Sequence, residues 1–484
     1  MGHTEAVAHN GQISEQLAPT LPRTVGQLRA AGYRRRSVKQ ELRANLLRRL
    51  SSEEPLFEGI VGYDETVVPA IENAILAGQD ICLLGERGQA KTRLARLLVE
   101  LLDEEIPVIA GSELNDDPLA PISPAGRQLV ADEGEAAPIA WLPRSRRYGE
   151  KLATPDITIA DLIGEVDPIK VAEGRYLADE TTIHYGLIPR HNRGIFTINE
   201  LPDLAERIQV GLLNILEERD VQVRGYTLRL PLDLFVVASA NPEDYTSRGR
   251  IITPLKDRLG SQIRTHYPRT IDEEIAIMQQ ERTRFADDDG PLLEEPAFML
   301  ELVAEVSQLA RRSPEISQRS GVSVRVSVAN LEVLLAAATK RAVRLGEPTA
   351  APRISDLGAL LATTAGKIEL ETLGEDAAQE RVVERLLGRA VHNVFARRID
   401  IDDLDELVDA FEAGLVLQTG DRVSLADYSR RLEETPGLAV AVRGLSADTP
   451  AASAAAVEFL LEGLHLNRRL NKDRATEGTA RYRA

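Results

Sequence analysis

Residues 81–92 read ICLLGERGQAKT, and residues 93–101 continue as RLARLLVEL. The four leading apolar residues predict a short buried strand, and the leucines that recur every three or four positions predict a helix with one apolar face. Between them, Gly85 and Gly88 let several backbone N–H groups point at one place, while Lys91-Thr92 adds a cation and a hydroxyl able to ligate Mg²⁺. The N-terminus of the helix adds partial positive charge. This order of elements predicts a phosphate-binding loop.

The loop differs from the pattern G-x-x-x-x-G-K-[ST] at one position, because Ala90 stands where the second glycine is usual. The alternative interpretation is a glycine turn that only connects a strand to a helix. The complete order of strand, turn, Lys-Thr pair and helix favours phosphate binding.

A second motif, residues 194–201, reads GIFTINEL and predicts an apolar strand that ends in two polar residues. In a mononucleotide-binding sheet, the first such residue holds the metal or its water, and the second polarises the water that attacks the γ-phosphate. Glu200 suits the second role. Asn199 takes the first position, where aspartate is usual, and its amide oxygen lacks the negative charge that Mg²⁺ favours. The alternative is a strand that merely ends in polar residues.

A third buried strand is predicted by residues 234–242, LFVVASANP, with Asn241 at its tip, either to orient the attacking water or as a plain cap. Strands alternate with helices from about residue 55 to 268, which predicts an α/β domain with a doubly wound parallel sheet and its ligand at the strand C-termini. Residues 269–375 predict a second, helical domain. Residues 376–484 predict a helical C-terminal extension that ends in a polar tail.

The N-terminal segments differ in composition from the rest. Residues 1–22 are polar without a sustained period and are predicted to be disordered. Residues 23–54 predict a basic helical extension, whose arginines are expected to face solvent and cover the next domain rather than touch a phosphate.

Composition limits the class of protein. A chain of 484 residues, 43% of them apolar, is expected to form roughly two to four domains. It has no apolar run of the length that spans a membrane and no apolar signal core at its start, which predicts a soluble cytoplasmic protein. The net charge of −18 argues against a nucleic-acid-binding surface and favours a protein partner. The single cysteine, Cys82, is expected in the core, and the histidine spacing predicts no structural zinc.

Residues 55 to about 345 resemble AAA+ ATPases of the magnesium-chelatase I-subunit and MoxR type. Three stretches carry the resemblance. Ile60-Val61-Gly62 is similar to the adenine-side turn of the family, residues 88–92 (GQAKT) to the MoxR form of the phosphate loop, and residues 186–195 (GLIPRHNRGI) to the chelatase segment before the second motif. The resemblance implies a P-loop AAA+ fold in which residues 269–375 are the lid, with a helix-2 insert at about 167–186 and a hairpin insert at 221–230.

The resemblance also implies roles for single residues. Asn241 matches the sensor 1 position, Arg258 the arginine finger that reaches the nucleotide of a neighbouring subunit, and Arg325 the sensor 2 position on the lid. With Glu200 these are the expected catalytic residues, and Mg²⁺ is expected at Thr92 and Asn199. The expected ATP-binding residues are Val61, Gly62, Gly85, Gly88, Gln89, Ala90, Lys91, Thr92 and Arg93.

Members of this family form rings, usually hexamers, and commonly work with a partner that carries a von Willebrand factor A domain. The leading hypothesis is therefore a ring-forming ATPase that remodels or activates a partner protein, with metal insertion into a porphyrin as a narrower version. The alternative is a nucleotide-gated assembly scaffold with negligible hydrolysis, because Asn199 replaces the usual aspartate. An enhancer-binding transcription activator would need a G-A-F-T-G-A loop and a DNA-binding helix pair, and the sequence contains neither. Neither a membrane nor direct nucleic-acid contact is expected.

Overall fold

The structure is a computed structural model that describes residues 21–166, 183–217, 221–223, 226–228, 230–241, 250–285, 290–317, 321–371, 376–476 and 478–484. Two regions predicted from the sequence fall mainly outside these ranges. They are the disordered N-terminal segment, of which residues 1–20 are not described, and the helix-2 insert, of which residues 167–182 are not described.

The first part of the chain mixes helices and strands, as predicted. Its helices are α1 (Val25–Ala30), α2 (Val38–Ser51), α3 (Val67–Leu76), α4 (Lys91–Leu97), α5 (Pro124–Glu133), α6 (Ile159–Leu162), α8 (Leu187–Arg190), α9 (Glu206–Glu217) and α10 (Thr253–Arg258), with short 3₁₀ turns between them. Its strands are β1 (Ile81–Leu84), β2 (Glu105–Ile109), β3 (Ile139–Pro143), β4 (Tyr148–Leu152), β5 (Gly164–Val166), β6 (Ile183–Tyr185), β7 (Gly194–Asn199), β8 (Val221–Val223), β9 (Tyr226–Leu228), β10 (Leu234–Ala240) and β11 (Ser261–Arg264).

Five of these strands form one sheet in the order β11-β1-β10-β7-β4. All four pairings are parallel, with Leu84 opposite Ala240, and Asn199 opposite Leu152. Since parallel strands end at the same edge of a sheet, the polar residues that follow β1, β7 and β10 meet there. The parallel α/β architecture predicted from the sequence is confirmed.

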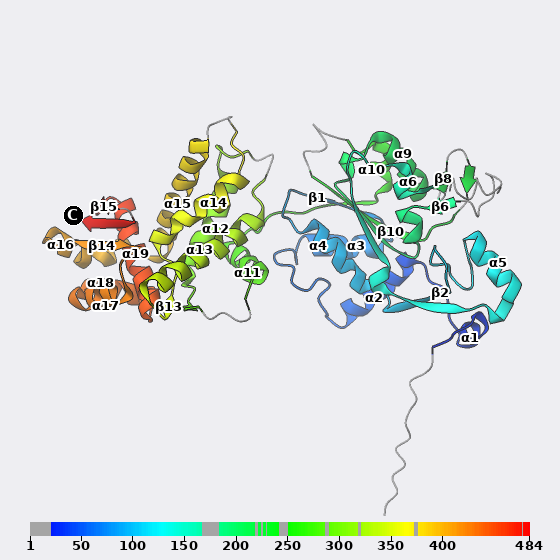
Figure 1. Cartoon of the computed structure of the whole chain (residues 1–484), viewed down its shortest axis with the longest axis horizontal. Coiled ribbons are helices and arrows are strands. Elements are labelled where there is room, and N and C mark those ends of the chain that lie inside the picture. The colour runs from blue at the N-terminus through cyan, green and yellow to red at the C-terminus, as the bar shows by residue number, and fades with distance from the viewer. Residues whose placement is uncertain are drawn as a thin grey trace, which may run out of the picture.

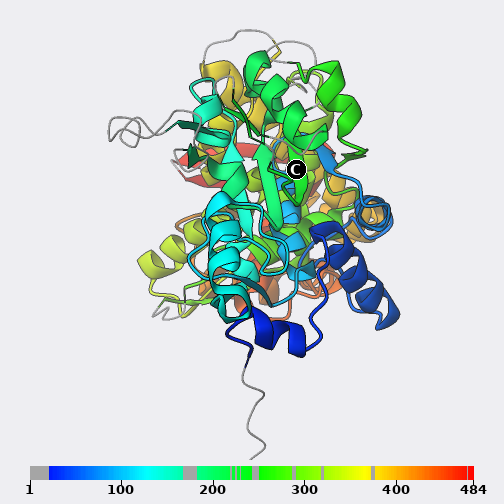
Figure 2. The ribbon, with the colours of Figure 1, turned by 90° about the vertical axis from the view of Figure 1, so that its right-hand side faces the viewer.

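The sheet is covered on both faces (Figure 1). Alternate residues along a strand point to opposite faces, so Ile81 and Leu83 pack toward α2, α3 and α4, while Cys82 and Leu84 pack toward α9 and α10. Cys82 is a buried core residue, as predicted. Figure 2 views the chain from the α/β end and shows the dark blue N-terminal helices at the lower edge of this part.

The second part is mainly helical. Its helices are α11 (Ile271–Glu281), α12 (Ala297–Arg312), α13 (Val324–Leu345), α14 (Leu360–Thr364), α15 (Asp376–Arg398), α16 (Asp405–Glu412), α17 (Leu425–Glu434), α18 (Pro436–Gly444) and α19 (Pro450–Leu466). Its strands are β12 (Leu292–Leu293), β13 (Thr349–Ala350), β14 (Leu417–Gly420), β15 (Asn471–Thr476) and β16 (Thr479–Arg483).

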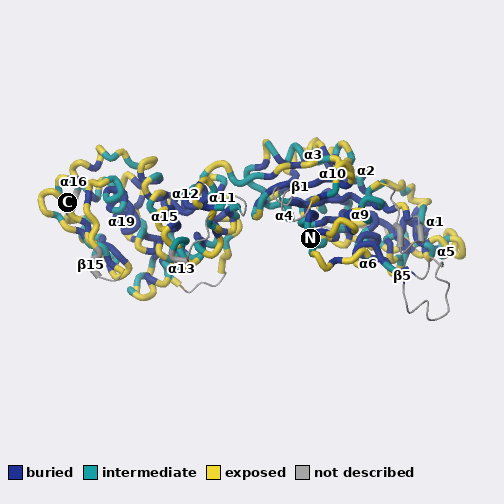
Figure 3. Tube along the Cα trace, turned by 90° about the horizontal axis from the view of Figure 1, so that it is seen from above, coloured by how far each residue is buried: buried dark blue, intermediate teal, exposed yellow. Residues whose placement is uncertain are grey.

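One hydrophobic core runs through this second part from Met278 to Tyr482. At its centre the ring of Phe459 on α19 stacks on Phe298 of α12, with centroids 4.9 Å apart, and contacts Phe395 of α15. Figure 3 shows these buried segments in dark blue. The helices before and after residue 375 therefore share a core, and the boundary proposed there remains a prediction.

The strands agree with the sequence-based expectation in one place and differ from it in two. The predicted hairpin near residue 225 is present as β8 and β9. β4, at the edge of the central sheet, was not predicted from the sequence. The expected polar tail instead forms β15 and β16, which with β14 make an antiparallel sheet that buries Tyr482. Among the described residues no helix is long and apolar enough to cross a bilayer.

Candidate functional site

The predicted phosphate-binding loop joins β1 to α4 at the C-terminal edge of the sheet. Gly88 has φ +78°, and Ala90 has φ 54°, in the left-handed region, directly before α4 begins at Lys91. An alanine in this conformation costs about 1–2 kcal/mol relative to the right-handed region. The chain therefore makes the turn with alanine at the position where the motif usually has glycine.

Gln89 closes the loop from inside. Its side-chain oxygen accepts hydrogen bonds from the backbone N–H of Glu86 (3.0 Å) and from the Thr265 hydroxyl (2.7 Å), and the residue is buried. The Tyr63 hydroxyl lies 3.0 Å from the Gln89 carbonyl oxygen and 2.8 Å from that of His266. Burial raises the pKa of Tyr63 to about 12, so the hydroxyl remains a donor at neutral pH. These bonds fix the loop to the end of β11 and to the segment that contains Val61 and Gly62.

Lys91 and Asn241 come together across the edge of the sheet. The Lys91 ammonium donates to the Asn241 side-chain oxygen (3.0 Å), to the Glu86 carbonyl (2.8 Å) and to the Gly85 carbonyl. Asn241 follows β10, whose last residue pairs with the last residue of β1. The sheet register thus places the loop cation beside the polar tip of the neighbouring strand.

Thr92 and Asn199 also meet. The Thr92 hydroxyl lies 3.4 Å from the Asn199 side-chain oxygen, which is 3.3 Å from the hydroxyl of Ser239. Ser239 in turn accepts a hydrogen bond from the backbone N–H of Glu200 (3.2 Å). Ser239 was not predicted from the sequence, although it lies two residues before Asn241, a spacing that gives both side chains the same direction in an extended chain.

Glu200 directly follows β7 and has φ 55° and ψ 47°. A non-glycine residue in the left-handed region is uncommon, and such strain concentrates at functional sites. At Glu200 the chain therefore leaves the direction of β7, and the backbone N–H of Glu200 bonds to the Ser239 hydroxyl.

The oxygen atoms of this site can be compared with the ligands that Mg²⁺ prefers. Thr92 and Asn199 supply neutral oxygens, and Glu200 supplies the adjacent carboxylate. Among the described residues, no group of three or more His, Cys, Asp or Glu side chains is placed so that it could hold a metal ion by itself. Mg²⁺ typically takes one or two carboxylates and completes its shell with substrate phosphates and waters. The residues therefore suit a Mg²⁺ that arrives with a nucleotide.

The remaining predicted residues occupy the rim. Gly62 has φ +78° and lies against the Glu273 carboxylate of α11. The Arg93 guanidinium pairs with Glu281, also on α11. Burial raises the pKa of the Glu281 carboxyl. The hydrogen bonds from Arg93 and Gln280, with the charge of Arg93, lower it by more, so this pKa lies below its ordinary value. The structure thus places Arg93 in a bridge between the loop helix and the helical part.

Arg325 and Arg258 differ in surroundings. Arg325 is exposed in the first turn of α13, and its neighbour Ser323 lies against Gly88 of the loop. Arg258 ends α10, away from α13, and binds the carboxylates of Glu217 and Asp257 (3.4 Å for Asp257). Of these two arginines, Arg325 is therefore the one whose element contacts the loop of the same chain.

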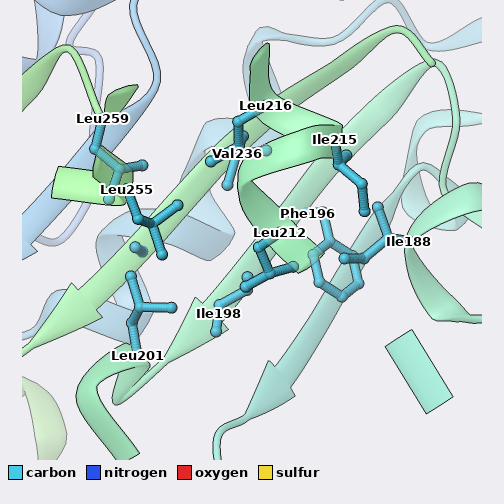
Figure 4. A pocket seen from close by; sticks show the side chains of 11 residues that line it. Ile188, Phe196, Ile198, Leu201, Leu212, Ile215, Leu216, Val236, Leu255 and Leu259 are labelled. Atoms are coloured by element: carbon cyan, nitrogen blue, oxygen red, sulfur yellow. The ribbon is translucent and has the colours of Figure 1, made fainter. Parts of the chain in front are cut away.

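A separate cavity lies on the face of the sheet that α9 and α10 cover, between these helices and the strands β7 and β10 (Figure 4). Its volume is about 20 Å³, and its walls are aliphatic or aromatic side chains such as Phe196, Leu212 and Leu255. Ligand pockets in proteins measure several hundred Å³ and include placed polar groups. This cavity is a packing gap.

Comparison with known proteins supports the resemblance at a distance. No family model matches the chain. The magnesium-chelatase subunit ChlI-1 of Arabidopsis thaliana is 28% identical over 240 residues, which are 47% of this chain and 52% of that protein. The chain is a distant homologue of magnesium-chelatase I subunits. It spans about half the length of the first curated relatives that it matches.

Similarity to solved structures is weak. NtrX from Brucella abortus in complex with ATP gives a TM-score of 0.41 at 14% identity, over 81% of this chain and 72% of that one. A chain of the complex between subunits BchI and BchD of magnesium chelatase gives 0.33 at 20% identity, over 68% of this chain and 97% of that one. TM-scores this low establish no detailed correspondence. The homology rests on sequence, and the α/β sheet with its helical second part rests on this chain's own structure.

Proposed function

We propose that this chain is a ring-forming AAA+ ATPase that binds and hydrolyses ATP to remodel or activate a partner protein. One observation carries the proposal. The phosphate loop, the end of β7 and the end of β10 converge at one edge of a parallel sheet, with Lys91 3.0 Å from Asn241 and Thr92 3.4 Å from Asn199. A cation, a hydroxyl and two polar strand tips in this arrangement suit phosphoryl transfer to water.

Each residue then has a defined task. The loop amides and Lys91 hold the β- and γ-phosphates of ATP, and Thr92 with Asn199 holds Mg²⁺ directly or through water. Bound Mg²⁺ would neutralise charge on the phosphates. Glu200 accepts a proton from the attacking water and Asn241 orients that water. Val61, Gly62 and the rest of the loop complete the nucleotide site.

The arginines serve closure and assembly. Arg325, on the helix that touches the loop, senses the phosphates as the lid (residues 269–375) closes. Arg258 acts in trans on the nucleotide of the next subunit of a ring, most simply a hexamer. A partner with a von Willebrand factor A domain is inferred from the family resemblance, and so is a role in metal insertion. Residues 376–484 extend the lid.

A second function is favoured by Asn199. An amide oxygen gives Mg²⁺ no negative charge, so the chain would bind ATP and order an assembly without appreciable hydrolysis.

Phosphate release at saturating ATP and Mg²⁺ separates the two functions. The measurement compares the wild type with Glu200→Gln, which should bind ATP but lack the proton acceptor. Turnover well above this variant supports the ATPase. ATP binding with turnover equal to the variant would leave the scaffold function, and no ATP binding would refute both.

A further inference from the structure

The segment between β11 and α11 connects the phosphate loop to the helical part through Tyr267. The Tyr267 hydroxyl donates to the carbonyl oxygen of Arg87 in the loop at 3.0 Å. Burial raises the pKa of Tyr267 well above its ordinary value, so the hydroxyl stays protonated and remains a donor. The loop backbone is therefore bonded to the segment that leads into the lid.

The guanidinium of Arg311 lies over the face of the Tyr267 ring. Its guanidinium carbon is 4.4 Å from the ring centroid, a distance at which a cation is attracted to the ring face. Its two terminal nitrogens donate to the Glu274 carboxylate at 2.6 and 2.9 Å, and Glu274 is fully buried in the first half of α11. This bidentate ion pair has the geometry that carboxylate and guanidinium favour.

The same pair holds both sides of Arg325. The Arg311 Nε donates to the Val322 carbonyl at 2.9 Å, and Glu274 accepts a hydrogen bond from the Ser327 hydroxyl. Val322 lies three residues before Arg325, and Ser327 lies two residues after it. Arg311 and Glu274 thus hold the turn of α13 that carries Arg325.

Close contact brings this turn onto the loop. A Cβ added at Gly321 would collide with the Glu86 carboxylate and the Tyr267 hydroxyl, and one added at Gly88 would collide with the Ser323 hydroxyl. Two glycines, one on each side, allow the loop and the start of α13 to meet.

We propose that Tyr267 and Arg311 are positioning residues, which set the place of Arg325 relative to the phosphate loop and so couple closure of the lid to the bound nucleotide. The inference rests on the proposed function, since it assigns Arg325 a role toward the phosphates. A purely structural role for the same contacts would stabilise the lid without acting through Arg325.

A double-mutant cycle tests this coupling. Tyr267→Phe removes the hydroxyl and keeps the ring under Arg311, so the lid should still fold. Loss of one hydrogen bond in a positioning contact should lower kcat about fivefold to tenfold in the wild type. In the Arg325→Ala background the same substitution should change kcat less than twofold, because the residue that it positions is gone.

Equal factors in the two backgrounds would overturn the inference. If the chain binds ATP without hydrolysing it, the cycle is read in the ATP dissociation constant instead, with the same criterion. A wild type that neither binds nor hydrolyses ATP refutes the proposed function and the inference together, whereas equal factors in an active protein refute the inference alone.

The neighbouring arginine provides the matched control. Arg312 is exposed, and its guanidinium donates to the side-chain oxygen of Gln308 on the same helix at 3.4 Å, so Arg312→Ala should leave kcat within twofold. Hydrogen exchange supplies a readout that does not depend on activity. Tyr267→Phe should speed exchange both in residues 86–89 and in residues 322–327, and Arg312→Ala in neither. Unchanged exchange in both segments of Tyr267→Phe would also contradict the proposal.

Discussion

Gly88 of the phosphate loop lies in direct contact with Ser323, the cap residue of α13, so closely that a methyl group on residue 88 would overlap the serine hydroxyl. The two residues are separated by more than two hundred positions in sequence and belong to the α/β and the helical parts. A nucleotide bound at the loop, as proposed, would therefore be within reach of the first turn of α13. Single substitutions at this contact therefore test where the start of α13 lies relative to the loop.

Gly321→Ala should weaken ATP binding by at least about tenfold. Residue 321 has φ +62°, which alanine adopts at a cost of about 1–2 kcal/mol, and the new methyl would collide with Glu86 and Tyr267. The lid would have to move away from the loop. Calorimetric titration with ATP in the Glu200→Gln background measures the loss without turnover. Gly366→Ala, with no atom within 4 Å of its added methyl, is the control, and equal losses in both variants would contradict the close contact.

Lys91→Ala should abolish ATP binding. The ammonium is held by the carbonyls of Gly85 and Glu86 and by Asn241 at the edge of the sheet. In the proposed site it is the main counter-charge to the β- and γ-phosphates. Lys340→Ala, on the exposed side of α13, removes the same charge elsewhere. An unchanged ATP dissociation constant for Lys91→Ala would refute the assignment of the phosphate loop.

Arg258→Ala should spare ATP binding and cut turnover by a factor on the order of 10³, because an arginine supplied by a neighbour acts only in the transition state. In this structure Arg258 binds Glu217 of its own chain. Glu217→Gln should weaken the hold on the guanidinium within its own chain and raise turnover at low protein concentration by up to about fivefold, the range of an exposed ion pair.

Arg207→Ala, on the exposed face of α9, is the control and should neither lower turnover, as Arg258→Ala does, nor raise it, as Glu217→Gln does. The measurement is phosphate release per chain as a function of protein concentration, with particle mass by light scattering. Turnover independent of concentration in a particle that stays monomeric would exclude the ring.

Much of the site could be predicted because its signals are local. Four consecutive apolar residues directly before a glycine turn indicate a strand buried on both faces, and β1 spans Ile81–Leu84 as predicted. The glycine turn and the polar tips of β7 and β10 needed no knowledge of distant contacts.

Other features depend on contacts that leave no local pattern. β4 reads YGEKL, with no apolar run, and becomes a strand through pairing of Tyr148 with Ile195, far along the chain. β15 and β16 are rich in charged residues and are fixed by burial of Tyr482. The pair of Arg311 with Glu274 joins two helices across 37 positions, and no spacing rule connects charges at that separation.

Glu41→Gln should lower the free energy of unfolding of the α/β part by about 3–5 kcal/mol, the usual effect of breaking a buried ion pair. Both oxygens of Glu41 accept from Arg147 at 2.7 Å, and the two side chains are 4% and 1% exposed. The pair fixes α2, in the basic N-terminal extension, to the segment before β4. Trp141, bonded to the Pro22 carbonyl, gives a fluorescence signal for this part in a urea titration. The exposed ion pair of Arg430 with Asp427 is the contrast, and Arg430→Ala should cost at most about 1 kcal/mol.

Asn199→Asp should lower the Mg²⁺ concentration for half-maximal turnover by about tenfold and raise the maximal rate. The residue touches Thr92 and Ser239 through its side-chain oxygen, so aspartate fits the same space and adds the charge that the metal favours. Asn73→Asp, the same change on the exposed side of α3, controls for the added negative charge. The readout is phosphate release over a Mg²⁺ titration at fixed ATP. If the dependence on Mg²⁺ does not shift while Glu200→Gln still stops turnover, Asn199 does not face the metal, and the polar end of β7 acts through Glu200 alone.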